Sequence, residues 1–201
     1  MNWGSTDVKN VAIGIAAFVI VLLVVIVLRT RRGFSMLPSN SSQSTPAEAY
    51  VGLRNMILHG SREKLNLPPT SRPTEPWGVV MDFAVSRGTV TVTSLSDGNA
   101  SIYLSSGGGY LGGVGKPAIH SAAQNFVRTA SEFQAAMNPA AEFPLPERGQ
   151  VSFYVLTDAG VFTGRAAEEE LRQRHHPLTK LFAAGQEVIT QYRLDQEVSR
   201  H

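Results

Sequence analysis

The chain has 201 residues, no cysteine and a formal net charge of +2 at pH 7. Without cysteine the sequence offers no disulfide, thiolate metal site, iron–sulfur cluster or thiol nucleophile. The positive charge comes from residues 1–33, because residues 34–201 hold 14 basic and 15 acidic residues. No basic excess is left to follow a phosphate backbone, so we expect no nucleic-acid partner.

An apolar segment over residues 11–28 is the most informative feature of the chain. Its eighteen consecutive residues carry no polar side chain. A membrane core of about 30 Å needs roughly 20 apolar residues in a helix, so the segment predicts a transmembrane helix. A signal peptide has a shorter apolar region that ends in small residues, whereas this one ends in Val27 and Leu28. We therefore expect a short extramembrane N-terminus over residues 1–10 and a retained anchor with its basic flank over residues 11–32.

The flanks of this anchor predict its orientation. Three basic residues follow the apolar run directly, and Lys and Arg close to the membrane favour the cytoplasmic side. The predicted topology places the N-terminus outside and the C-terminal domain in the cytoplasm. Small residues in the outer half of the helix would let a partner helix approach closely, although such residues are also common in membrane helices. The basic flank is Arg29, Arg31 and Arg32, and the small residues are Ala12, Gly14 and Ala16.

A polar linker separates the anchor from the folded domain. Residues 33–44 are rich in Ser and Asn and lack hydrophobic periodicity, which is typical of a flexible tether. The domain then spans residues 45–201. Its first helix is predicted to start with a capping box, in which Thr45 is the N-cap and Glu48 lies three residues on. Gly60 is expected to end this helix.

Three strands are expected next, over residues 79–85, 89–95 and 101–105. Apolar residues alternate with Thr and Ser in this region. Such alternation predicts an antiparallel sheet with one face in solvent. Asp82 falls on the face opposite Met81 and Phe83, where we expect it to face water or pair with an arginine.

A long helix should begin at Pro117 and bury one continuous apolar stripe. A second hairpin follows, with strands at residues 150–157 and 161–166, and the last helical region is interrupted at His176 and Pro177. The predicted order is α-βββ-α-ββ-α: a two-layer α+β domain with a mainly antiparallel five-stranded sheet and helices on one face. This element content is similar to that of small profilin-like modules, including roadblock and longin domains. Those domains reverse the strand count around the central helix, so the resemblance implies no activity.

The glycine-rich segment at residues 105–118 is the candidate ligand site. Its G-x-G-x-x-G spacing matches a dinucleotide fingerprint, but the delayed helix and the neighbouring hairpin do not fit that motif. Backbone amides of such a loop can still hold a small anion. Alternatively, the glycines let the chain pass close to the sheet. The candidate ligand-binding residues are Gly107, Gly108, Gly109, Gly112, Gly113 and Lys116.

Four apolar side chains are candidate interaction anchors, and the same residues could instead cap the core of their own domain. They are Tyr103, Tyr110, Leu111 and Phe143. The five histidines lack metal-ligand spacing, and no Ser, His and Asp fall in a known catalytic pattern. We therefore name no metal, cofactor or catalytic residue.

The sequence favours a non-catalytic, single-pass accessory or assembly subunit of a larger membrane protein complex. Its expected partners are other membrane subunits, together with lipid around the anchor. The alternative hypothesis is a membrane-tethered sensor that binds a small anionic ligand or nucleotide at residues 106–116. The glycine-rich segment is central to both, as a docking element or as a ligand loop.

Overall fold

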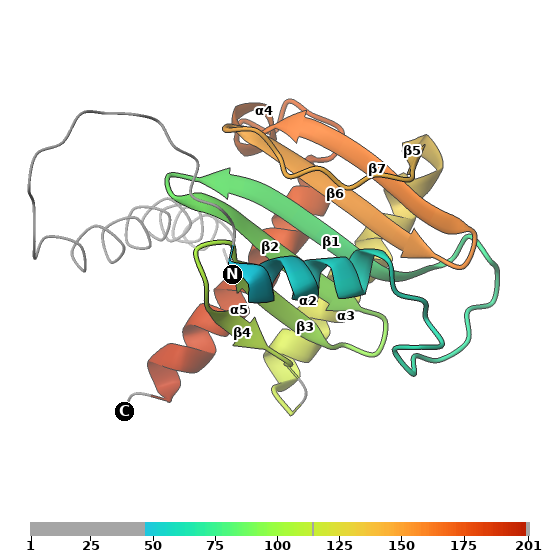
Figure 1. Ribbon diagram of the computed structural model, residues 1–201, viewed down its shortest axis with the longest axis horizontal. Helices are drawn as coiled ribbons and strands as arrows, with labels where there is room; N and C mark the ends of the chain where they lie inside the picture. Colours follow the sequence, from blue (N-terminus) through green and yellow to red (C-terminus); the bar gives the residue numbers. More distant parts are fainter. Residues whose placement is uncertain (1–46, 114, 200–201) are drawn as a thin grey trace, which may run out of the picture. The chain divides into compact units, whose positions relative to one another are not determined.

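A seven-stranded sheet organises the protein, whose computed structural model describes residues 47–113 and 115–199. The described residues all belong to one compact unit. The strand order is β4-β3-β2-β1-β6-β7-β5, and every neighbouring pair is antiparallel (Figure 1). The elements are α2 (Glu48–Leu58), β1 (Pro76–Val85), β2 (Gly88–Leu95), β3 (Ala100–Leu104), β4 (Gly109–Leu111), α3 (Pro117–Phe133), the 3-10 helix η1 (Gln134–Ala136), β5 (Asn138–Ala140), β6 (Gln150–Thr157), β7 (Gly160–Ala167), α4 (Glu168–Arg172) and α5 (Thr179–Val198).

The α+β class and the antiparallel sheet are confirmed, but the expected number of five strands is wrong. The predicted strands correspond to β1, β2, β3, β6 and β7. The two further strands, β4 and β5, have three residues each and form the two edges of the sheet. A segment of three residues does not show an alternation of apolar and polar residues, and the glycine in β4 and the proline in β5 also disfavour a strand prediction.

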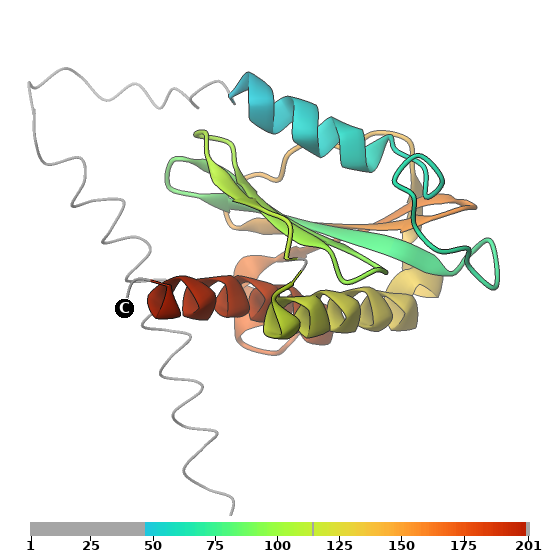
Figure 2. The ribbon, with the colours of Figure 1, turned by 90° about the horizontal axis from the view of Figure 1, so that it is seen from below.

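Helices cover both faces of the sheet, so the expectation that all helices lie on one face is wrong. Figure 2 shows α3 and α5 on one side of the sheet and α2 on the other. The face predicted to be in solvent is closed as well, since Thr91 and Thr93 on β2 are buried. Threonine is suited to either environment because a buried hydroxyl can be satisfied by a hydrogen bond.

The larger core lies between the sheet and the pair α3 and α5. The apolar stripe predicted for α3 is buried there, with Ile119, Ala123 and Phe126 almost inaccessible. Gly185 allows α5 to approach the sheet, because a Cβ atom at this position would lie 2.8 Å from the Met81 sulfur. The smaller core lies under α2, where Ile57 and other apolar residues pack together; the rest of this buried cluster is Leu58, Leu67, Trp77, Val80, Tyr154 and Leu156.

The helix ends follow the sequence signals only in part. The capping-box prediction is wrong, because α2 begins at Glu48 and its N-cap is Ala47. The Ala47 amide donates a hydrogen bond to the Ser105 carbonyl oxygen (2.8 Å), which ties the chain to the sheet just before the helix. The interruption at His176 is confirmed: its Nδ1 accepts a hydrogen bond from the Leu178 amide between α4 and α5.

Within residues 47–113 and 115–199, no helix combines the length and apolar character that a membrane span requires. The predicted anchor at residues 11–32 and the linker at residues 33–44 lie outside the described residues. The anchor and its topology therefore stay predictions from the sequence.

Replacing Phe126 by Ala should lower the free energy of unfolding by about 3–5 kcal/mol, because it leaves a cavity at the centre of the larger core. Urea unfolding of the full-length protein in mild detergent measures this loss. Met56→Ala is the control, since this side chain is 52% exposed and should change stability by less than about 0.5 kcal/mol. Equal losses for the two variants would contradict the assignment of the core.

Candidate functional site

The glycine-rich segment builds the edge of the sheet. Its turn is closed by a hydrogen bond from the Gly107 amide to the Leu104 carbonyl, and the Leu104 amide donates to the Gly108 carbonyl. Gly107, Gly108 and Gly109 all have positive φ angles, of 96°, 84° and 149°. At Gly109 a Cβ atom would lie 2.1 Å from the Ile102 carbonyl oxygen. Glycine is therefore required here for close passage along β3, as the second interpretation of the segment predicted.

The other residues of the predicted ligand loop bond within the domain. The Gly112 amide donates to the Ser101 hydroxyl (3.2 Å), and a Cβ at Gly113 would lie 2.3 Å from the side chain of Ile119. Lys116 precedes α3, and its ammonium lies 2.9 Å from an Asp195 carboxylate oxygen. The Lys116 ammonium and the Gly112 amide are the groups that would hold an anion. Both already have partners within the domain. Ligand binding at this loop stays a prediction.

The four predicted interaction anchors divide into two pairs. Tyr103 is buried, and Phe143 packs edge-on against the Tyr154 ring, so both contribute to the interior of their own domain. Tyr110 stacks on a tyrosine of α5 yet stays 43% exposed, and Leu111 is 67% exposed. Only Tyr110 and Leu111 remain as surface residues, both on β4. Outside the described residues lie Ala12, Gly14, Ala16, Arg29, Arg31 and Arg32.

The chain enters the domain beside this edge. Ala47 is bonded to Ser105 in the β3–β4 turn, and a Cβ at Gly107 would lie 3.9 Å from the Ala47 Cβ. The Ser105 hydroxyl in turn accepts a hydrogen bond from the Thr89 amide (2.8 Å). The turn that leads into β4 therefore also holds Ala47, the first residue that the structure describes.

A buried ion pair joins α2 to the centre of the sheet. Arg54 donates from Nε and Nη2 to one oxygen of Asp82, at 3.0 and 2.6 Å. The Thr91 hydroxyl donates to the other oxygen at 2.5 Å, and the Tyr50 hydroxyl lies 2.9 Å from that of Thr91. Asp82 is completely inaccessible and Arg54 is 6% exposed. Of the two alternatives expected for Asp82, pairing with an arginine is confirmed and exposure to water is wrong.

The same guanidinium also bonds to the segment around Phe143, whose ring packs against His59 at the end of α2. Its Nη1 donates to the Phe143 carbonyl (2.9 Å), and its Cζ lies 5.7 Å from the Tyr154 ring centre. The Tyr154 hydroxyl donates to the carbonyl of Pro144 (2.8 Å). Arg54 therefore fastens α2 to the sheet and holds Phe143, while Tyr154 holds Pro144.

Burial governs the titration of this network. It raises the pKa of Asp82, while the Arg54 guanidinium and the Thr91 hydroxyl oppose the rise. Burial and the nearby Asp82 charge raise the pKa of Tyr50 to about 12. With both carboxylate oxygens bonded and no access to solvent, Asp82 fastens α2 and has no open position for a reacting atom. The network is structural.

Sequence reasoning missed Arg54, although a signal for it exists. Tyr50, Arg54, Ile57 and Leu58 recur at helical spacing and all four are buried in α2. An arginine on the apolar stripe of a helix needs a buried partner, and Asp82 is a carboxylate in an otherwise apolar strand. The two anomalies together would have predicted the pair.

Comparison with known proteins gives no assignment: no family model matches the chain, and neither the curated proteins nor the solved structures include a significant match. Among the residues that the structure describes, no three His, Asp or Glu side chains are grouped so that they could hold a metal ion. The site is therefore defined by its own geometry, in which the exposed edge strand β4 lies beside the point where the chain enters.

Thr91→Val should destabilise the protein by about 1–3 kcal/mol, because it removes a donor from the buried Asp82 carboxylate. The matched control is Thr93→Val on the same strand, whose hydroxyl makes only a 3.4 Å contact with the Ser101 carbonyl. Its loss should stay below about 1 kcal/mol. Urea unfolding measures both, and equal losses would contradict the importance of the Asp82 network.

Stability should fall as the pH rises from 10 to about 12. Burial raises the pKa of Tyr50 and of Tyr192 from 10.0 to about 12, so the unfolded chain releases these protons at lower pH than the folded one. Tyr50→Phe and Tyr192→Phe should each make the decrease shallower, even though each variant starts less stable. Unfolding free energies measured in steps across this range test the prediction, and unchanged slopes in both variants would contradict it.

Proposed function

We propose that the protein is a single-pass membrane protein whose α+β domain is a non-catalytic accessory or assembly subunit. In this proposal residues 11–28 anchor it beside other membrane subunits, and β4 receives an extended segment of one of them as an additional strand. The observation that carries the proposal is the exposed β4 edge with Tyr110 and Leu111 on it. Strand addition at a free sheet edge supplies main-chain hydrogen bonds and side-chain specificity together.

The two edges of the sheet differ in a way that favours β4. Natural proteins protect free edges with proline, charge or very short strands, because an unpaired edge invites another chain. Both edge strands have three residues, but β5 contains Pro139, which has no amide hydrogen to donate. The sequence of β4 is Gly-Tyr-Leu, with neither proline nor charge, and all three residues are exposed. Of the two edges, β4 is the better docking strand.

The register of β3 and β4 indicates which backbone groups face outward. Residue pairs that exchange hydrogen bonds recur at every second position of an antiparallel ladder. Since the Leu104 amide donates to Gly108, the next such pair is Ile102 with Tyr110. The amide and carbonyl of Leu111, one residue further, then point to the free edge. A docking strand would bond to these groups.

The length of the linker supports a membrane partner. Fourteen residues, 33–46, separate the predicted basic flank from Ala47. At about 3.5 Å per residue they reach at most about 50 Å. Because Ala47 is bonded to the β3–β4 turn, β4 stays within this reach of the membrane. A subunit embedded in the same membrane is thus the partner most accessible to β4.

Leu111→Pro should reduce the amount of co-purifying partner about tenfold, because it removes the outward amide and the apolar side chain at this edge position. Native mass spectrometry of the full-length protein, extracted in mild detergent from its own membranes, measures the assembly. Leu111→Ser keeps the amide and should retain part of the partner.

Two controls separate docking from folding. Leu145→Ser changes another exposed leucine, 38% accessible and remote in sequence from β4, and should leave the assembly intact. The unfolding midpoint of Leu111→Pro should stay close to that of the unmodified protein, because proline is tolerated at outward positions of an edge strand. A lone monomer in the unmodified extract, or an intact assembly with Leu111→Pro, would overturn the proposal.

A further inference from the structure

A polar groove lies between α3 and the segment that leads into β1. Its volume is about 630 Å³. One wall presents Arg72 and Glu75, and the other presents Gln124, Arg128 and Ser131 from α3. Most of these side chains are exposed, so the groove is open to solvent. None of its residues belongs to β4 or to the buried ion pair.

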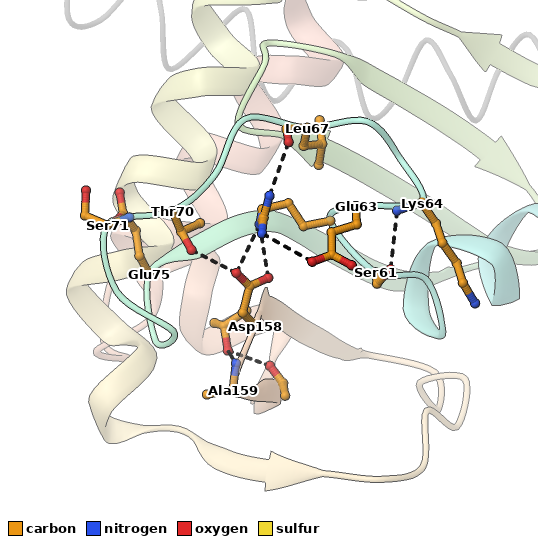
Figure 3. A network of polar contacts seen from close by, with 12 residues as sticks. Ser61, Glu63, Lys64, Leu67, Thr70, Ser71, Glu75, Asp158 and Ala159 are labelled. Carbon is orange, nitrogen blue, oxygen red and sulfur yellow. Dashed lines mark hydrogen bonds and ion pairs between the residues drawn. The ribbon is translucent and has the colours of Figure 1, made fainter.

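The wall formed by the segment before β1 is held in place by hydrogen bonds (Figure 3). Arg62 donates from Nε to both carboxylate oxygens of Asp158 in the β6–β7 turn, at 3.3 and 3.0 Å. The Thr70 hydroxyl donates to the same carboxylate (2.9 Å), and the Ala159 amide donates to the Pro73 carbonyl (2.8 Å). This segment has no regular structure, but its contacts with the β6–β7 turn make the groove preformed.

The charges in the groove are unbalanced toward positive. Glu75 is the one acidic residue in the lining, and its carboxylate already accepts the Ser71 amide (2.7 Å). Arg128 donates to the side-chain oxygen of Asn125 (2.7 Å), which orients the guanidinium without neutralising it. The Arg72 carbonyl accepts the Glu75 amide (2.9 Å), but its side chain has no hydrogen-bond or ion-pair partner among the described residues. Two guanidiniums, one on each wall, are thus available for an anionic ligand.

We propose that this groove binds an acidic, extended peptide segment of a partner protein. Guanidinium groups pair with side-chain carboxylates, and the amides and hydroxyls of the lining can bond to a peptide backbone. The open shape admits a continuous chain, whereas a small molecule is usually buried in a more apolar and enclosed pocket. The proposal stands apart from docking at β4, so either can fail without the other.

Fluorescence anisotropy with fluorescein-labelled hexaglutamate tests the groove in the full-length protein in mild detergent. We expect saturable binding, which Arg72→Gln and Arg128→Gln should each weaken about fivefold to tenfold through loss of a charged hydrogen bond. The double variant should retain only the weak background that the basic flank at residues 29–32 contributes. Labelled hexalysine should not bind in the groove.

Arg148→Gln is the matched control, because it removes the same charge from an exposed position that does not line the groove. It should leave the dissociation constant within about twofold. If Arg148→Gln weakened hexaglutamate binding as much as the groove variants do, the binding would depend on net charge alone. That result would overturn the site. Absence of saturable binding, or an unchanged double variant, would overturn it as well. If inorganic pyrophosphate bound more tightly than hexaglutamate, the peptide proposal would be overturned in favour of a small anion.

Discussion

The ion pair between Arg54 and Asp82 fixes α2 on the sheet. The cover over the face of the sheet opposite α3 and α5 depends on this pair. A helix of eleven residues is marginal by itself, so α2 exists because its buried side packs. A buried ion pair adds little stability compared with an apolar pair of the same size, but loss of one partner costs about 3–5 kcal/mol. Two nitrogens of Arg54 bond to one Asp82 oxygen, and this geometry depends on the position of α2. The pair therefore specifies where the helix lies.

The closure of both faces determines which surfaces remain for interaction. Because Arg54 also bonds to the Phe143 carbonyl, the same guanidinium holds this segment on the face that α2 covers. Most apolar residues of the longer strands belong to the two cores. Among the described residues, the β4 edge and the groove beside α3 are two surfaces that stay accessible. The β4 edge presents backbone groups together with Tyr110 and Leu111, whereas the groove presents mainly polar side chains and is floored in part by Val127 of the larger core.

Strong periodicity made most of the fold predictable from the sequence. The alternation in β1 and β2 and the stripe of α3 identified buried residues correctly, because each pattern recurs several times within one element. The sequence did not predict that α2 covers the threonine-bearing face of the sheet. Threonines on a strand fit solvent and a hydrogen-bonded interior equally well. Arg54 shows the same ambiguity: an arginine in a helix is usually exposed, and only its position between Tyr50 and Leu58 reveals burial. The edge strand β4 was not predicted, because it is defined by its pairing with β3 and a local sequence pattern does not contain that pairing.

The two accessible surfaces differ in the physics that a partner would use. At β4 a docking strand gains main-chain hydrogen bonds between neutral groups, which salt screens little. In the groove an acidic segment pairs with exposed guanidiniums of Arg72 and Arg128, and at 0.15 M salt such charges are screened beyond about 8 Å. A partner that occupies both surfaces would be oriented by charge and retained by the strand. Charge pairing accelerates encounter more than it strengthens the complex, so the groove would act first and β4 would decide how long the complex lasts.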